Sequence, residues 1–308
     1  MVSPPQASGD KMPIRVRPQS GPEVLCPSAA DLTAMIRRIG GEGDHFLVLE
    51  RVPYAPREFI QVYRDEDNPF NVEYRDGGAQ QYDTEISDPE DVALVFSVWA
   101  RREPEWKSGV DWRPSYLHPD VEVTPLSEAA ARSATERARR YLDEGFLSFE
   151  AMAQEISDCA ERDEPVTIEQ AEILLEPLWI ERVEQQRSWP DVTDVDRIAA
   201  AFAQLDDSGV TARMHFSCCM NCGTGEIAAE RAAGDHGYVF FHYQDTENAV
   251  GGELYLAYGS HAGDDVEGEA VGQEVVKALQ AAGLSTEWDG SIRQRIRVVG
   301  LDWKKRLR

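Results

Sequence analysis

The sequence predicts an α+β fold with two small antiparallel-sheet-plus-helix units separated by an all-helical segment. Strand-like runs bounded by turn residues, with helical stripes beside them, occur near both ends of the chain. The middle of the chain shows helical periodicity alone. Hydrophobic residues make up 42% of the 308 residues, which is enough for packed cores. The predicted division is a disordered tail (1–21), an α+β domain (22–117), a linker (118–126), a helical segment (127–208) and a second α+β domain (209–308).

In the first α+β domain, a helix is expected from a cap at Ser28 to the stop at Gly40-Gly41. A second helix begins at Asp88 or Asp91. The turn sequence Asp76-Gly77-Gly78 predicts a hairpin. Between the two helices we expect a meander of strands over 46–52, 58–63, 71–74 and 80–84.

The helical segment is expected to hold four helices, over 127–142, from Ser148, from Thr167 and over 195–205. Pro177 falls inside the third helix and predicts a kink. Cys159 lies on an apolar stripe and is interpreted as a core residue. The last domain is expected to contain helices over 223–233 and 271–282 and strands over 210–216, 238–243, 253–258 and 292–299.

The net charge of −25, from 31 basic and 56 acidic residues, bounds the kind of partner. Residues 118–209 hold 8 basic and 22 acidic residues, and therefore −14 of this charge. Such a field repels nucleic acid and anionic membranes and favours a basic protein partner. Near the end of the chain, basic residues predominate. Docking of this basic stretch on the acidic helical segment is therefore a rival to an external partner.

The sequence favours a cytoplasmic location. No apolar run reaches the roughly 18 residues of a membrane span, and the first residues lack the apolar core of a signal peptide. Five cysteines are an odd number, and three of them crowd into Cys218–Cys222, unlike a disulfide framework. The chain has 26 Arg and only 5 Lys, which is typical of GC-rich bacterial genomes.

The stretch from His215 to Gly223 is the best candidate for chemistry. Cys219 and Cys222 are spaced like half of a zinc site, and Cys218 or His215 can add a third ligand. His236 or His242 can supply a fourth from a distance. A thiol-redox centre is the alternative, with Cys222 activated at a helix N-terminus and Cys219 as its disulfide partner. Small thiols packed into a strand-to-helix turn are the structural alternative.

His242 is the second candidate. It shares a strand face with Tyr238 and Phe240, and Asp245 or Glu247 lies close enough in sequence to orient it as a general base. Paired with Cys222 it would form a nucleophile and base. The alternative is a structural histidine beside a helix cap made by Asp245 or Thr246. Phosphate-loop, dinucleotide, serine-hydrolase and HExxH motifs are absent from the sequence.

Arg293, Arg295 and Arg297 alternate along a predicted strand, so that all three are expected on one face. Such a strip can hold an anion or an acidic partner. Pairing with the acidic helical segment or plain solvation is the alternative.

Four phrases of the C-terminal region resemble a bacterial family of unknown function: Phe216–Gly223, Gly237–Glu247, Leu256–Gly259 and Trp288–Ser291. The resemblance implies no activity. In the first domain, Phe59-Ile-Gln61 and Val72–Gly77 are similar to small immunity-protein-like domains that accompany bacterial toxins. That similarity implies binding without catalysis.

Two hypotheses follow from the sequence. The first is an interaction protein that binds a basic protein, in the manner of immunity proteins. The second is a metal- or thiol-dependent enzyme centred on Cys218, Cys219 and Cys222, with zinc as the candidate metal and His215 and His242 as helpers.

Overall fold

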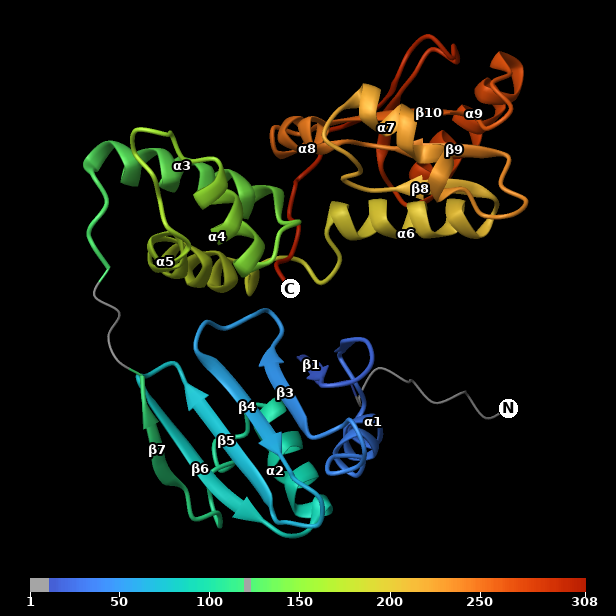
Figure 1. Ribbon diagram of the computed structural model, residues 1–308. Coiled ribbons are helices and arrows are strands. Elements are labelled where there is room, and N and C mark those ends of the chain that lie inside the picture. The colour runs from blue at the N-terminus through green and yellow to red at the C-terminus, as the bar shows by residue number, and fades with distance from the viewer. Residues whose placement is uncertain (1–10, 119–122) are drawn as a thin grey trace, which may run out of the picture. The chain divides into compact units, whose positions relative to one another are not determined.

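The computed structural model describes residues 11–118 and 123–308, and it confirms the α+β class (Figure 1). The chain divides into two compact units, of which the first ends at Thr124 and the second spans Pro125–Leu307. Each unit contains one sheet and its own helices. Among the described residues, no helix combines the length and the apolar character that crossing a bilayer requires.

The N-terminal unit is a seven-stranded antiparallel sheet with two helices. The strand order is β2-β1-β3-β4-β5-β6-β7, and α1 and α2 share one apolar core with the sheet. Ser28 caps α1 through a reciprocal pair of bonds with Asp31, and Asp88 caps α2. The elements are β1 (Ile14–Pro18), β2 (Val24–Leu25), α1 (Ala29–Ile36), β3 (Phe46–Arg51), β4 (Glu58–Tyr63), β5 (Phe70–Asp76), β6 (Gln80–Ile86), α2 (Pro89–Ala100) and β7 (Arg113–Leu117).

Strand β1 corrects the prediction of a disordered tail over residues 1–21. Residues 1–10 lie outside the described part, whereas Ile14–Pro18 pair along β3 in the interior of the sheet. Met12, Ile14 and Val16 are fully buried. The strand was missed because it contains only two alternating apolar residues, Ile14 and Val16, and prolines stand at positions 13 and 18.

The second unit begins with three helices that pack on one another. They are α3 (Glu128–Glu144), α4 (Phe149–Asp158) and α5 (Ile168–Gln186). Their caps are Ser127, Ser148 and Thr167. Helix α5 continues through Pro177. Cys159 is exposed at the end of α4, which corrects its assignment to the core: the helix ends one residue before it.

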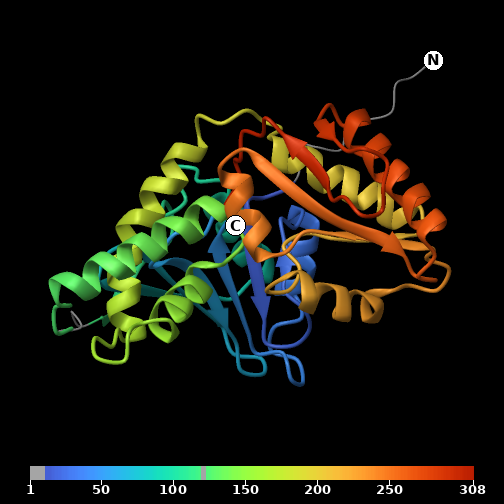
Figure 2. The same cartoon turned by 90° about the horizontal axis from the view of Figure 1, so that it is seen from above.

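A five-stranded sheet completes the second unit, in the order β11-β12-β10-β9-β8. The pair β8–β9 is parallel, and the other pairs are antiparallel. Helices α6 and α9 contact each other and share the largest core with the sheet, and Figure 2 shows them side by side. The elements are α6 (Asp194–Asp207), β8 (Val210–Arg213), α7 (Met220–Glu226), a 3-10 turn (Ile227–Glu230), β9 (Gly237–Phe240), α8 (Tyr243–Val250), β10 (Glu253–Ser260), α9 (Asp265–Ala281), β11 (Ser285–Glu287) and β12 (Ile296–Val299).

The position predicted to separate two domains, between residues 208 and 209, does not separate two cores. Ile198 and Phe202 of α6 lie in the same core as Val210 of β8. The basic stretch at the end of the chain also returns to the helices: Arg306 pairs with Asp196 at 3.0 Å. This ion pair is the internal docking that the charge distribution offered as a rival to an external partner.

Candidate functional site

The loop that carries the cysteines follows β8 and is held by β9. The amide of Phe216 donates to the carbonyl of Phe241, and the amide of Tyr243 donates to the carbonyl of Ser217. His215 and Ser217 have positive φ angles of 51° and 63°, a conformation that side chains other than glycine seldom adopt. These two conformations, separated by one residue, turn the chain sharply. Cys218, which follows the turn, is exposed.

A small apolar cluster supports the loop from the face of the sheet opposite the main core. Phe240 and Ile227 are buried there, and Phe216 and Met220 pack against them. Gly223 lies against the ring of Phe240, and a Cβ atom at this position would come within 2.5 Å of the ring. Glycine therefore allows α7 to lie directly on the sheet, which fixes where Cys222 stands.

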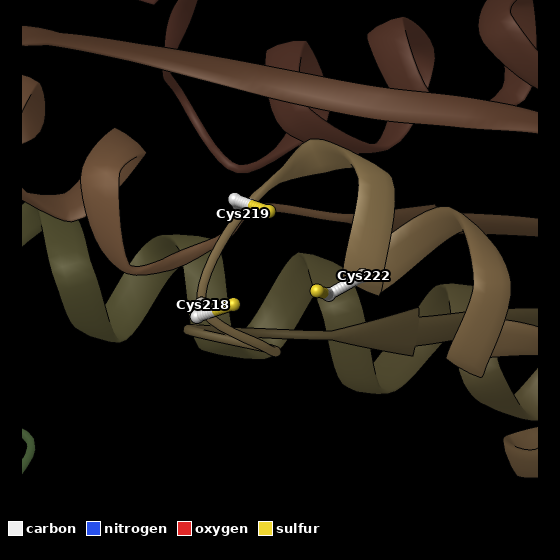
Figure 3. Close-up of side chains that lie close together, drawn as sticks. All are labelled: Cys218, Cys219 and Cys222. Carbon is white, nitrogen blue, oxygen red and sulfur yellow. The ribbon is translucent and has the colours of Figure 1, made fainter.

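The three cysteines form one group. Their Sγ atoms all lie within 4.8 Å of one another, and the residues are free thiols. Figure 3 shows the sulfur atoms of Cys218 and Cys222 pointing toward one another, with Cys219 beside them at the start of α7. Cys218 is exposed, and the other two are partly buried. The group could hold a metal ion, which is one of the alternatives that the sequence left open for Cys218, Cys219 and Cys222.

The pKa values of Cys219 and Cys222 shift in opposite directions. Hydrogen bonds from the backbone of Cys222 and from the neighbouring thiols lower the pKa of Cys219. The pKa of Cys222 is raised to about 11, because its thiol bonds to Cys218 and Cys219 and sits beside their charge. The direction of these shifts favours a thiolate at Cys219 over one at Cys222, the thiol that the redox hypothesis names as activated.

His215 is not part of the cysteine group. Its ring is stacked between Phe146 and Tyr243, and its Nδ1 bonds to Oγ1 of Thr246 at 2.8 Å. Burial and the charge of Lys305 lower the pKa of His215 to about 4. These contacts anchor the loop.

His242 is also absent from the cysteine group. It is buried and caps α8, and its ring lies against Asp245, with Nε2 at 3.2 Å from Oδ2. Asp245, which is 2% exposed, receives two further bonds from Arg295, of 2.9 and 2.6 Å. Burial lowers the pKa of His242, and the nearby Asp245 opposes this shift. The geometry is that of the structural alternative, a capping histidine, and does not support a base for Cys222.

The predicted strip of three arginines is not a strip. Strand β12 starts only at Ile296, so Arg293 and Arg295 precede it. Arg295 pairs with Asp245, and Arg297 pairs with Glu253 and Glu287 at 2.9 and 3.1 Å. Two of the three charges are therefore matched within the domain.

The remaining candidates lie elsewhere. His236, proposed as a distant fourth ligand, lies against Glu274. Cys26 and Cys159 are free thiols outside the group. A polar cluster that the sequence did not suggest joins Thr211 to Asp235 and His261, at 2.6 and 3.0 Å. Thr211 is fully buried, so this cluster ties β8 to the following loops and offers no reactive hydroxyl.

Comparison with known proteins identifies a family of unknown function. No curated protein matches the chain, and no solved structure matches it either. Residues 127–307 match a family described as a domain of unknown function, DUF6891. The match covers the second compact unit almost completely, helices and sheet together. The chain therefore belongs to the DUF6891 family.

Proposed function

We propose that the C-terminal domain binds a thiophilic metal ion, with zinc the preferred occupant, through Cys218, Cys219 and Cys222. The observation that carries the proposal is the mutual distance of the three sulfur atoms, at most 4.8 Å. Thiolates at Zn–S distances of about 2.3 Å in a tetrahedron lie about 3.8 Å apart. Small side-chain rotations bring the three sulfurs to that spacing.

The proposed site has an open coordination position. Among the described residues, no histidine, aspartate, glutamate or further cysteine joins the group of three. A tetrahedral ion held by three thiolates then takes its fourth ligand from outside the site, as water or a small molecule. Since Cys218 is exposed, this ligand can reach the ion from solvent. An open position is the property that lets a bound zinc act on another molecule.

Cobalt substitution tests the metal site. Reduced, metal-free full-length protein should bind one Co²⁺ with thiolate charge-transfer bands and the intense visible bands of tetrahedral coordination, and Zn²⁺ should displace it. Cys218→Ser, Cys219→Ser and Cys222→Ser should each weaken these bands, whereas Cys159→Ser should leave them unchanged. A spectrum that lacks thiolate bands, or that survives all three substitutions, would refute the proposal. Loss of two thiols to a disulfide in air, with no metal bound, would favour the redox alternative.

We also propose that the N-terminal unit binds a basic protein. The excess of acidic residues in this part of the chain, 20 against 13 basic residues over 1–117, and the similarity to immunity-protein-like domains support this second function. The structural observation in its favour is that large apolar residues are exposed on α2 and on the edge strand β7: Leu94, Tyr116 and Leu117 are 62, 53 and 65% exposed. Apolar residues beside carboxylates suit a partner that is both basic and partly apolar.

Salt-dependent capture from lysate tests this second function. The immobilised protein should retain proteins of high isoelectric point at low salt and release them as salt shortens the Debye length from about 30 Å to about 8 Å. Retention of acidic proteins alone, or of none, would contradict the proposal. Binding that does not depend on salt would contradict its electrostatic basis.

A further inference from the structure

The N-terminal unit contains a cleft of about 620 Å³ between α2, the end of β6 and the loop of residues 105–113. The volume is that of a ligand site rather than of a packing gap, since ligand pockets occupy about 300–1,000 Å³. All of its lining belongs to the N-terminal unit, and it is separate from the cysteine group of the other unit.

Part of the cleft is apolar. Val95, Val98 and Trp106 line it and are half-buried, and Leu94 lines it with 62% of its surface exposed. The ring of Trp106 has edge contacts with Tyr74 and Trp112, at centroid distances of 4.7 and 5.9 Å. The neighbouring rings hold this indole in place, and the ammonium of Lys107, which pairs with Asp76, lies 5.1 Å from its ring centroid. The indole is thus a fixed ring that already accepts a cation.

The charged part of the cleft is acidic. One basic side chain, Arg113, stands against four carboxylates. Within the described part of the chain, no ion pair joins these four carboxylates to a basic side chain. The four are Glu85, Asp91, Glu105 and Asp111.

The four carboxylates do not form a cation site. Within the described residues, the cysteines are the one group of possible ligands whose atoms come within 4.8 Å of one another. The carboxylates are thus spread around the cleft, whereas Ca²⁺ or Mg²⁺ needs oxygens that converge within about 2.6 Å of the ion. Separated charges over an apolar lining fit a longer cation with an aliphatic body.

We propose that this cleft receives an arginine side chain presented by a basic segment of a protein partner. The guanidinium donates to carboxylates in a planar fork and stacks on the indole of Trp106, while the methylene stem covers the valines. The inference rests on the proposed binding of a basic protein and names the contact that would anchor it. It does not depend on the metal site.

Titration with short peptides tests the assignment. The probe is a blocked arginine-containing peptide with apolar neighbours, and the matched probes replace arginine with lysine or with citrulline, which is uncharged. Binding to full-length protein is measured by calorimetry and by the NMR signal of the Trp106 indole, assigned with Trp106→Phe. The arginine peptide should bind and shift this signal, the lysine peptide should bind more weakly, and the citrulline peptide should not bind.

Two charge-matched variants separate the cleft from the general field. Glu105→Gln with Asp111→Asn removes two charges from the cleft, and Asp65→Asn with Asp67→Asn removes two exposed charges outside its lining. The first should lower the affinity for the arginine peptide about tenfold at low salt, and the second should change it less than about twofold. Melting temperatures of both variants establish that the fold is retained.

The outcomes distinguish the cleft from the broader function. Equal losses in the two variants would overturn the cleft assignment, while capture of basic proteins from lysate would still stand. Absence of binding by the arginine peptide, or a Trp106 signal that does not move, would overturn the cleft assignment in the same way. Failure of salt-dependent capture would instead overturn the partner-binding function on which it rests.

Discussion

Two polar clusters follow neighbouring parallel strands of the C-terminal sheet, the cysteines after β8 and His242 with Asp245 after β9. Both contain residue types that often act in catalysis. Because β8 and β9 are parallel, both clusters follow strand ends that lie at the same end of the sheet. The second cluster is buried, and its atoms are bonded to one another and to Arg295. In the first, the thiols are partly or fully exposed and bond mainly to one another.

The comparison separates structural from available chemistry. A buried carboxylate has to find its partners inside the protein, because an unpaired charge away from water is costly. Asp245 is paired with Arg295 and His242, so it stabilises the fold and its oxygens are not available to a substrate. The sulfurs of the cysteine group are near the surface, so they do not need partners inside the protein and remain able to bind a ligand. The predictions below follow this contrast in order of their expected effect on stability.

Asp245→Ala should have the largest effect on stability. The substitution leaves Arg295 without its carboxylate and removes one half of the α8 cap, and we expect a loss of about 4 kcal/mol in the free energy of unfolding. Urea unfolding measures the loss. Asp207→Asn, at an exposed aspartate at the end of α6, is the control and should change stability by less than about 0.5 kcal/mol. A loss below 1 kcal/mol for the alanine variant, on the order of a surface change, would remove the contrast between the clusters.

His215, which lies between the two clusters in sequence, should make the free energy of unfolding depend on pH in the acidic range. Its pKa is about 4 in the folded chain and about 6.5 when unfolded, so the unfolded state takes up the proton first. The stabilisation is complete above pH 6.5 and is lost as pH falls toward 4, by about 3 kcal/mol in total. His215→Asn should flatten this part of the curve, and asparagine tolerates the positive φ angle.

The pH dependence of stability has to be compared between the wild type and His215→Asn, because Glu144 changes stability with pH in the opposite direction. Burial raises its pKa to about 7, so its contribution is present at low pH and is lost as pH rises from about 4.5 through 7. Denaturant unfolding of the wild type and His215→Asn between pH 4 and pH 8 isolates the histidine term by difference. Parallel curves would show that this imidazole does not titrate as stated.

Gly223→Ala should have a smaller effect on stability and a clear one on the metal site. The added methyl meets the buried ring of Phe240, so α7 has to move, at a cost of about 2 kcal/mol. The Co²⁺ spectrum should weaken as Cys222 moves with the helix. Gly225→Ala, in the same helix and facing open space, should leave the spectrum intact and stabilise the helix slightly. Equal spectra in the two variants would contradict the role of Gly223.

The local parts of the fold were predictable from the sequence because their signals lie within a few residues. Strands β3 to β6 match the alternating runs closely, and Ser28 and Asp88 cap helices as expected. The short strand β1 and the exposed edge strand β7 were missed because their pairing partners lie far along the chain. Helix α8 was considered only as a cap at Asp245 or Thr246, whereas its cap is His242, which is not a common start signal.

The site shows the same division. The cysteine group was predictable because three thiols within five residues can hardly avoid one another. Arg295 and Asp245 are 50 residues apart, and no local sequence pattern predicts that they pair. For that reason the arginines were predicted as an open strip, and His242 was considered as a base.

The return of the chain end to the helices has a consequence for how the domain forms. The amide of Leu307 bonds to Gln186, 121 positions earlier, and the indole of Trp303 bonds to the carbonyl of Glu144, 159 positions earlier. Contacts between such distant positions require closure of long loops and slow the folding of a domain. We therefore expect helices α3 to α5 to form early through local contacts, and the contacts of the chain end with Gln186 and Glu144 to form late. Refolding kinetics followed at these positions would therefore report the last step of assembly.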